Sequence, residues 1–462
     1  MPVKKLLIFL IPFFIFFTVS CGKKDVAGEP VITDSVGRIN KWIYDSMRYY
    51  YYWNISIPSR PDYSLSTAAF FRSLLSSQDR FSAVSNRVDI GAVKNTFELY
   101  GFHYAVIEHP DLKTLVGVVT YSAVSTPAYR AGLRRGTCFI KVDDNYITRD
   151  GLGNVQALLQ SGNTVALTLA EPVNGQWTET EVAAVSSTLI TEPAVIQTKV
   201  FSWNGIKTGY LFYNGFTEKY DGSMLTAFSK MKQEGVSECI IDLRYNPGGS
   251  VSSSAKMAGM LTTIKGTDVY GIFQGNAREG RQTYSMERIL KTSSSSSGNT
   301  LSALITNRLS LQRVFLLTSR ATVSAAELLI NNLKPYITVI QVGDTTLGKD
   351  EASFEISDYR TPRQVEWVIR PIIYKLLNAN GKGGYNTGLV PAYQVNELSV
   401  FPLPDLGSTD DVLIHKALQL IYGNATVEEH TLRKASVQVT PVYGSAAAAS
   451  LVAPAVELPG VH

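Results

Sequence analysis

Ser324 lies in the segment TSRATVSAAELLINNLKPY, residues 318–336, and its neighbours allow it two roles. In the first it begins a helix, because Ser-x-x-Glu before an apolar run is a capping box in which Ser324 and Glu327 each accept a free backbone N–H. In the second its hydroxyl attacks a carbonyl, which requires a base to take the proton. The two roles are compatible, so other segments of the chain must decide between them.

Two further segments carry residue types that such chemistry could use. In DLRYNPGGS, Asp242 to Ser250, an apolar strand runs into Asn-Pro-Gly-Gly and then a helix. Paired glycines let the backbone approach a ligand, and the N–H groups that follow point outward. In GDTTLGKD, Lys349 follows a strand-like run, at the sheet edge where open α/β proteins bind ligands. The alternatives are a plain strand–turn–helix connection and a solvated surface lysine.

The composition indicates a multidomain globular protein. A chain of 462 residues is too long for one core, so about two to four domains are expected. Hydrophobic content of 45% and charged content of 18% are ordinary for globular proteins. The net charge of +4 is small and no basic stripe is present, which argues against a nucleic-acid partner.

The N-terminus has the pattern of an export signal. Two lysines precede an apolar run, Leu6 to Val19, which is followed by Ser20 and Cys21. The run is short for a spanning helix, which needs about 20 residues. A Cys directly after a small residue resembles a bacterial lipoprotein signal, and this resemblance implies a lipid anchor on Cys21 in the bacterial cell envelope, at the outer membrane or the periplasmic face. The alternative is an ordinary signal with an incidental Cys. We expect a signal peptide over 1–20 and a tether over 21–34.

The remaining cysteines, Cys138 and Cys239, lie in separate apolar runs and are expected to be buried free thiols. No Cys or His residues stand at metal-ligand spacing, so neither a metal nor another cofactor is predicted.

Hydrophobic patterning divides the rest of the chain. Residues 35–87 show helical spacing, and residues 88–190 show short strand-like runs. Residues 191–425 alternate strands and helices, which predicts βαβ units with a mainly parallel sheet. The tail, 426–462, has no clear period and is expected to be poorly ordered.

The second region resembles a PDZ domain. Ser125 to Leu133 followed by Gly136 is similar to the pattern S-P-A-x-x-A-G-L-x-x-G-D of such domains, with Thr137 in place of the Asp. Tyr100, Gly101 and Phe102 lie where a PDZ domain has its carboxylate-binding loop. Free loop N–H groups can hold a peptide's C-terminal carboxylate while the peptide adds a strand.

From about residue 40 to 425 the chain resembles the C-terminal processing proteases, also called tail-specific proteases. The family's D-L-R-x-N-P-G-G motif matches Asp242 to Gly249, its nucleophile segment matches Ser324 to Glu327, and its lysine matches Lys349, 25 residues after the serine. The N-terminal aromatic segment and DRFS, Asp79 to Ser82, are most similar to Bacteroidetes-type envelope members. The resemblance implies a multidomain α+β fold: a small helical N-terminal domain, a β-rich PDZ-like domain and an α/β catalytic core of the crotonase-like ββα type.

The resemblance also implies roles for individual residues. Ser324 would be the nucleophile and Lys349 its base, provided that burial lowers the pKa of the lysine. The oxyanion would be held by the N–H groups of Ala325 and Gly248, with Gly249 as an alternative donor. Glu327 would place the loop, and Ser353, where many members carry Gln, would help to orient the lysine.

The implied substrates are proteins or peptides with apolar C-termini, held by Tyr100, Gly101 and Phe102. Two alternatives remain: a non-catalytic peptide-binding or scaffold lipoprotein with the same fold, and an enzyme that stays closed until a partner binds.

Overall fold

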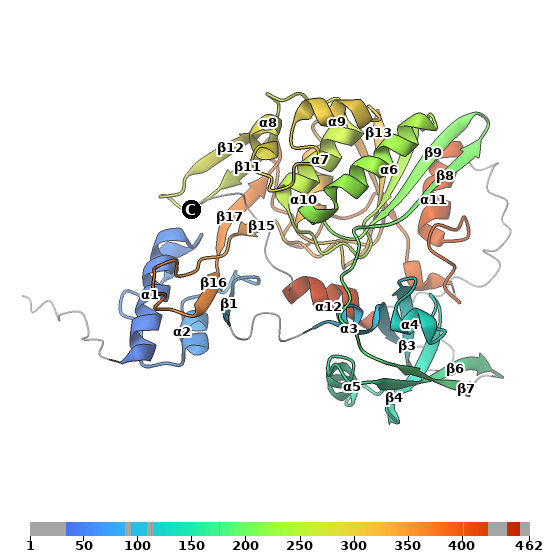
Figure 1. Cartoon of the computed structure of the whole chain (residues 1–462), viewed down its shortest axis with the longest axis horizontal. Helices are drawn as coiled ribbons and strands as arrows, with labels where there is room; N and C mark the ends of the chain where they lie inside the picture. Colours follow the sequence, from blue (N-terminus) through green and yellow to red (C-terminus); the bar gives the residue numbers. More distant parts are fainter. Residues whose placement is uncertain are drawn as a thin grey trace, which may run out of the picture.

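The computed structural model describes residues 34–87, 94–108, 112, 114–174, 176–400, 402–423 and 441–452. It contains a helical N-terminal segment, a β-rich domain and a larger α/β core (Figure 1). The predicted signal peptide, Cys21 and nearly all of the predicted tether lie outside the described residues. Within the described ranges, no helix has the length and apolarity needed to cross a membrane.

The N-terminal segment consists of helices α1 (Ser35–Tyr50) and α2 (Thr67–Ser73) followed by strand β1 (Ala83–Asn86), so the helical pattern expected there is present. The side chain of Asp34 accepts the N–H of Gly37 and starts α1. The two helices share one buried apolar cluster, which includes Ile369 of the core. Because β1 also pairs antiparallel with β16 (Trp367–Arg370), the segment is attached to the core.

The β-rich domain is built on a seven-stranded sheet in the order β19-β2-β3-β4-β6-β7, with β5 paired to β4. Its elements in chain order are α3 (Thr96–Tyr100), β2 (Phe102–Glu108), β3 (Leu115–Ser122), α4 (Pro127–Arg130), β4 (Cys138–Val142), β5 (Asn145–Tyr146), α5 (Leu152–Leu158), β6 (Val165–Val173) and β7 (Gln176–Val185). Residues 88–190 were expected to be mainly strand-like, but Thr96 to Tyr100 form helix α3. The reason is local: Asn95 and Glu98 form a capping box, and Gly101 ends the helix with φ of 87°.

The core contains a six-stranded sheet in the order β18-β14-β13-β10-β9-β8. Every pair from β9 to β18 is parallel and only β8 is antiparallel, which confirms the expected mainly parallel sheet. The strands are β8 (Val195–Trp203), β9 (Ile206–Tyr213), β10 (Glu238–Asp242), β13 (Arg313–Thr318), β14 (Thr338–Gly343) and β18 (Tyr393–Gln394).

Helices cover both faces of this sheet, as the continuous apolar strands require. The helices are α6 (Asp221–Gln233), α7 (Val251–Leu261), α10 (Ala325–Leu333) and α11 (Val412–Tyr422). Ile241 of β10 packs in the cluster that contains α6, α7 and α10, whereas Ile240 packs in the cluster that contains α11.

A second, four-stranded antiparallel sheet in the order β12-β11-β17-β15 was not expected from the sequence. It consists of β11 (Val269–Gln274), β12 (Arg281–Ser285), β15 (Glu351–Ser353) and β17 (Ile372–Leu377), and helices α8 (Met286–Leu290) and α9 (Leu301–Asn307) follow β12 in the chain. Because β15 starts two residues after Lys349, this sheet fixes the chain that leaves the lysine.

The expectation of a poorly ordered tail is wrong for residues 441–452. They form strand β19 (Pro441–Gly444) and helix α12 (Ser445–Val452), which lies between the β-rich domain and the core (Figure 1). Strand β19 pairs antiparallel with β2. The tail has no periodicity of its own, and its order comes from pairing with an available sheet edge. The remaining tail residues lie outside the described ranges.

Candidate active site

Ser324 lies between strand β13 and helix α10, in a backbone conformation that is rare for a residue with a side chain. Its φ is 58° and its ψ is −114°. Such a conformation costs about 1–3 kcal/mol and persists only where the surroundings hold it. The residue is 2% exposed, and its Oγ has no hydrogen-bond partner among the described residues. The hydroxyl therefore does not serve as the helix cap.

The cap of α10 is supplied by Glu327 instead. Its carboxylate accepts the N–H of Ser324 at 2.9 Å, the N–H of Lys349 at 2.8 Å and the N–H of Gly348 at 2.7 Å. The hydroxyl of Thr346 donates to the same group. Burial raises the pKa of Glu327, and these hydrogen bonds oppose the rise. One buried carboxylate thus fastens the loop of the lysine to the loop of the serine.

Lys349 is buried, with 3% of its surface exposed. Its ammonium makes no ion pair with any described carboxylate within 4.0 Å. Burial lowers the pKa of Lys349 to about 8, while the charges of Glu351 and Glu327 work in the opposite direction. Desolvation therefore dominates, as expected from the sequence, and the neutral amine is accessible near neutral pH.

The N-terminal segment reaches this lysine, a contribution that the sequence did not reveal. The ring of Phe81 lies 5.1 Å from Nζ of Lys349. Arg80 donates to the carbonyl oxygens of Gly348 and Asn386 and so holds the lysine's loop. Asp79 accepts the N–H of Phe81 at 3.0 Å, which shapes the turn. The sequence signal for this contact is the motif DRFS, an Asp-initiated turn that carries an aromatic residue.

Gly248 and Gly249 follow strand β10, with Gly248 facing Ser324 and Gly249 facing the backbone of Phe216. Their φ angles are 100° and 122°, which favour glycine. A Cβ on Gly248 would lie 2.7 Å from Cβ of Ser324 and 2.8 Å from N of Ala325. A Cβ on Gly249 would lie 2.2 Å from the carbonyl oxygen of Phe216. Only glycine allows such close approaches. This steric requirement explains why the sequence motif has two glycines at the turn.

The N–H groups of this turn are not equivalent. Gly248 N–H donates to Oδ1 of Asn246 at 2.9 Å and is occupied in this conformation. Within the described ranges, neither the N–H of Ala325 nor that of Gly249 meets an acceptor. Of the donors suggested by the sequence, Ala325 and Gly249 are therefore available, whereas Gly248 must first leave Asn246.

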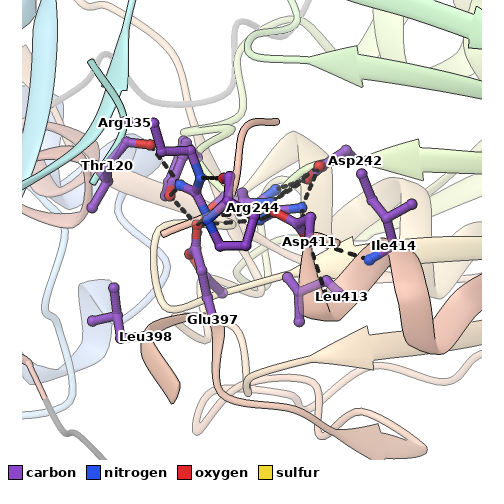
Figure 2. Close-up of polar contacts among 12 residues, drawn as sticks. Thr120, Arg135, Asp242, Arg244, Glu397, Leu398, Asp411, Leu413 and Ile414 are labelled. Atoms are coloured by element: carbon purple, nitrogen blue, oxygen red, sulfur yellow. Dashed lines mark hydrogen bonds and ion pairs between the residues drawn. The ribbon is translucent and has the colours of Figure 1, made fainter. Parts of the chain in front are cut away.

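A buried network of charged side chains surrounds Arg244, which precedes the glycine turn in the chain (Figure 2). Arg244 is fully buried and contacts Asp242 and Asp411 at 2.8 Å and Glu397 at 3.2 Å. Arg135 of the β-rich domain pairs with Glu397 at 2.7 Å. The Asp and Arg of the D-L-R motif are therefore structural groups, and they connect the strand end beside the turn to the neighbouring domain.

A cleft of about 510 Å³ opens beside the glycine turn. Its walls include Gly248, Gly249, Asn214, Phe216 and Glu218. Hydroxyl groups of Ser250 and Ser252 donate to Glu218 and help to lower its pKa to about 2 against the effect of burial. The wall therefore carries a fixed negative charge near the available N–H donors.

The remaining predicted residues do not join this group. Ser353 is fully buried and its hydroxyl has no hydrogen-bond partner among the described residues, so the expected orienting contact with Lys349 is not formed. Tyr100, Gly101 and Phe102 lie in the β-rich domain, and the N–H of Gly101 donates to Phe97 as part of the helix end. This N–H is therefore not free for a carboxylate.

The two remaining cysteines, Cys138 and Cys239, are free thiols. Burial raises the pKa of Cys138 to about 12 and also raises that of Cys239. The described residues contain no cluster of His, Cys, Asp and Glu suited to a metal ion.

Comparison with known proteins identifies the family. The model of peptidase family S41 matches residues 207–395, and the model of the Peptidase S41 N-terminal domain matches residues 38–83. The chain belongs to peptidase family S41. The first range contains Ser324, Lys349 and the glycine turn, and the second contains Phe81. Most of the β-rich domain lies outside both S41 ranges.

Curated S41 relatives support the same placement. A carboxyl-terminal-processing protease of Picosynechococcus is 23% identical over 274 residues, which cover 58% of this chain and 58% of the relative. A probable CtpA-like serine protease of Staphylococcus aureus is 24% identical over 232 residues, which cover 50% of this chain and 41% of the relative. The chain spans about half the length of these relatives. The resemblance to the C-terminal processing proteases is confirmed.

Two solved structures resemble most of the chain. A putative S41 protease from Bacteroides fragilis has a TM-score of 0.67 and 28% identity, covering 83% of this chain and 97% of the other. The photosystem II D1 C-terminal processing protease has a TM-score of 0.50 and 18% identity, and the match covers 84% of this chain and 99% of the other. The second likeness concerns the fold alone.

Proposed function

We propose that this S41 protein is a serine endopeptidase that cleaves proteins or peptides near their C-termini with a Ser324–Lys349 dyad. The observation that carries the proposal is the shared carboxylate of Glu327, which binds the backbone N–H of both Ser324 and Lys349. It is supported by the pKa of Lys349, which burial lowers to about 8. A strained, unpartnered serine and a desolvated lysine whose backbones are held by one carboxylate suit nucleophilic catalysis better than helix capping.

The proton moves between these two residues in each half of the reaction. Neutral Lys349 accepts the hydroxyl proton of Ser324 as Oγ attacks the scissile carbonyl carbon. The protonated lysine then donates that proton to the leaving amine, the C–N bond breaks, and an acyl ester forms on Ser324. In the second half Lys349 accepts a proton from water, which attacks the ester. Collapse of the second tetrahedral intermediate releases the carboxylic acid product and returns the proton to Oγ.

The tetrahedral intermediates carry a negative oxygen that needs preorganised donors. The N–H of Ala325 is the donor next to the nucleophile. The second donor comes from the glycine turn, either Gly249 as it stands or Gly248 after its N–H leaves Asn246. An occupied Gly248 N–H favours a resting site that is completed when substrate binds.

We also propose that the β-rich domain is PDZ-like and delivers substrates by their apolar C-termini, next to a crotonase-like core. Its strand β2 follows the segment Tyr100 to Phe102 and lies near the edge of the sheet, where a peptide can add a strand. Cys21 would anchor the protein by lipid in the bacterial cell envelope, close to exported proteins.

The proposal is tested with a quenched fluorescent peptide that has a free apolar C-terminus. Ser324→Ala and Lys349→Arg should both abolish cleavage, because a guanidinium keeps its proton and cannot act as a base. Lys334→Arg, an exchange at the exposed end of helix α10, is the matched control and should retain wild-type rates. Circular dichroism checks folding. A folded Lys349→Arg variant with full activity would exclude the dyad, and an inactive wild type that still binds the peptide would favour the scaffold alternative.

A further inference from the structure

Strand β19 occupies the open edge of β2 in the β-rich domain. Ile107, Val106 and Ala105 of β2 pair with Pro441, Tyr443 and Gly444 in an antiparallel register. Among the described residues, β3 is the one other strand that pairs with β2, on the side opposite β19. Without this segment, β2 would present unpaired backbone groups, which form a template for another extended chain.

The contact between the tail and β2 continues into the first residue of helix α12, Ser445, through its side chain. The Oγ of Ser445 accepts the N–H of Tyr104 at 2.8 Å, so a hydroxyl takes the place of the next backbone acceptor. Ser445 is 4% exposed and also contacts the ring of His103. Ala446 is buried in the core cluster that contains Phe97. The tail therefore runs along β2 as far as Tyr104 and His103, close to the start of the strand at Phe102.

Tyr443 is the one large apolar side chain that β19 contributes to the domain. Its ring lies 5.6 Å from that of Tyr104, and it packs against the cluster that contains Val155 of α5. The neighbouring Val442 is 38% exposed. The register shifts between Pro441 and Tyr443, so that Tyr443 faces the domain while Val442 stays at the surface.

We propose that residues 441–446 are a resident intramolecular ligand of the β2 edge and that a substrate binds there by displacing them. This inference rests on the proposed function, because the β2 edge is the site where a substrate's tail would add as a strand. The chain direction of β19 is the one such a tail would take, with its C-terminal side toward Phe102. The position of Tyr443 predicts a preference for peptides with an aromatic or large apolar residue at the matching position.

A covalently attached segment competes at an effective concentration set by its connection to the domain, which reaches the millimolar range for short flexible connections. Free peptides should therefore bind weakly until the segment is released. The segment is held by three paired residues, the partly buried ring of Tyr443, the contacts of Ser445 with Tyr104 and His103, and the buried Ala446, so a peptide with a better anchor can replace it.

The test measures binding and not cleavage, in the full chain carrying Ser324→Ala. The probe is a fluorescein-labelled peptide with the sequence of residues 439–446, VTPVYGSA, followed by fluorescence anisotropy. Tyr443→Asp places a charge in an apolar cluster and should release the segment. Val442→Asp puts the same charge on the exposed side of the same strand and is the matched control. We expect Tyr443→Asp to bind the probe at least about tenfold more tightly than Val442→Asp.

A reversible lock gives an independent readout in one protein. Cys replaces Ala105 and Gly444, which are paired across the two strands, and Cys21 and Cys138 are changed to Ser. Cα atoms of antiparallel partners are about 4.5–5.5 Å apart, within the range that a disulfide spans. Oxidation should abolish probe binding, and reduction should restore the weak binding of the unlocked chain.

Equal affinities for Tyr443→Asp and Val442→Asp, together with equal binding by the oxidised and reduced forms, would overturn the inference. If Tyr443→Asp fails to fold, the lock alone decides. A failure of the Ser324–Lys349 mechanism would leave these affinities unchanged, so the two proposals can fail separately.

Discussion

The carboxylate of Glu327 accepts the backbone N–H of Lys349 at 2.8 Å, across 22 residues of sequence. The same carboxylate holds the N–H of Ser324. Two loops that end different strands, β13 and β14, are thereby set at a fixed separation by a single buried anion. A capping glutamate has become the group that positions both members of the proposed dyad.

Glu327→Gln should therefore impair activity strongly, although the two side chains have nearly the same size. A carboxamide has one acceptor oxygen and an NH₂ group that would face backbone N–H donors, which leaves buried donors unsatisfied at about 1–3 kcal/mol each. We expect a large fall in kcat, a smaller change in KM and a lower Tm. Glu355→Gln, near the surface on another loop, is the control and should leave kcat unchanged. Wild-type kcat in a folded Glu327→Gln variant would contradict the positioning role.

The activity of the wild type should rise with pH through the pKa of Lys349, about 8. Only the neutral amine can take the serine proton, so the active fraction increases about tenfold per pH unit below that pKa. The measurement is kcat/KM between pH 6 and 10 with a peptide that has no titrating groups in this range. A flat profile would show that the base is not this lysine.

The buried lysine should also weaken folding at neutral pH. Burial lowers its pKa in the folded state to about 8, below the ordinary lysine value of 10.5, so the unfolded state binds the proton more tightly. The free energy of unfolding should rise by about 3 kcal/mol as pH increases from 8 to 10.5. Lys349→Met removes the buried charge, and its Tm should exceed that of the wild type at pH 7, with the difference shrinking above pH 8. A Tm difference that stays constant with pH would contradict this linkage.

The serine, the lysine and the paired glycines could be predicted from the sequence because each stands in a short motif. The parallel sheet could be predicted as well, since apolar runs such as Val314 to Leu317 are continuous. The role of Glu327 as a shared anchor was not readable, because it depends on a loop 22 residues away folding back over α10. The contact of Arg80 with Gly348 spans 268 residues and leaves no local pattern.

The tail and the carboxylate loop show a different limit. Pro441 to Gly444 has weak strand propensity, and its order depends on a sheet edge more than 330 residues earlier in the chain. Gly101 was assigned by position in a family pattern, but its N–H is used to end helix α3. Local capping chemistry therefore takes precedence over the motif at this position.

Phe81→Leu should shift the pH profile without abolishing activity. The ring lies 5.1 Å from Nζ of Lys349, and its face favours the charged form by about 0.5–2 kcal/mol. Leucine keeps the site apolar but removes this attraction, so the pKa of Lys349 should fall and the midpoint of the activity profile should move to lower pH. Phe71→Leu, in the core of the N-terminal helices, is the control for packing and should leave the midpoint in place. An unchanged midpoint in Phe81→Leu would remove the ring from the account of this pKa.

Arg244→Leu should be the most destabilising of these substitutions. The guanidinium is fully buried and pairs with Asp242, Asp411 and Glu397, so its removal leaves three carboxylates facing one another without the central cation. Breaking a buried ion pair by removing one partner costs about 3–5 kcal/mol, far more than a surface pair. Urea unfolding at pH 7 measures the loss, and the loss should diminish at acidic pH as the carboxylates become protonated. Arg360→Ala, which removes an arginine with 53% side-chain exposure from its pair with Asp358, is the control and should change stability little. If both variants unfolded at a similar urea concentration, the network around Arg244 would contribute no more to stability than a surface ion pair does.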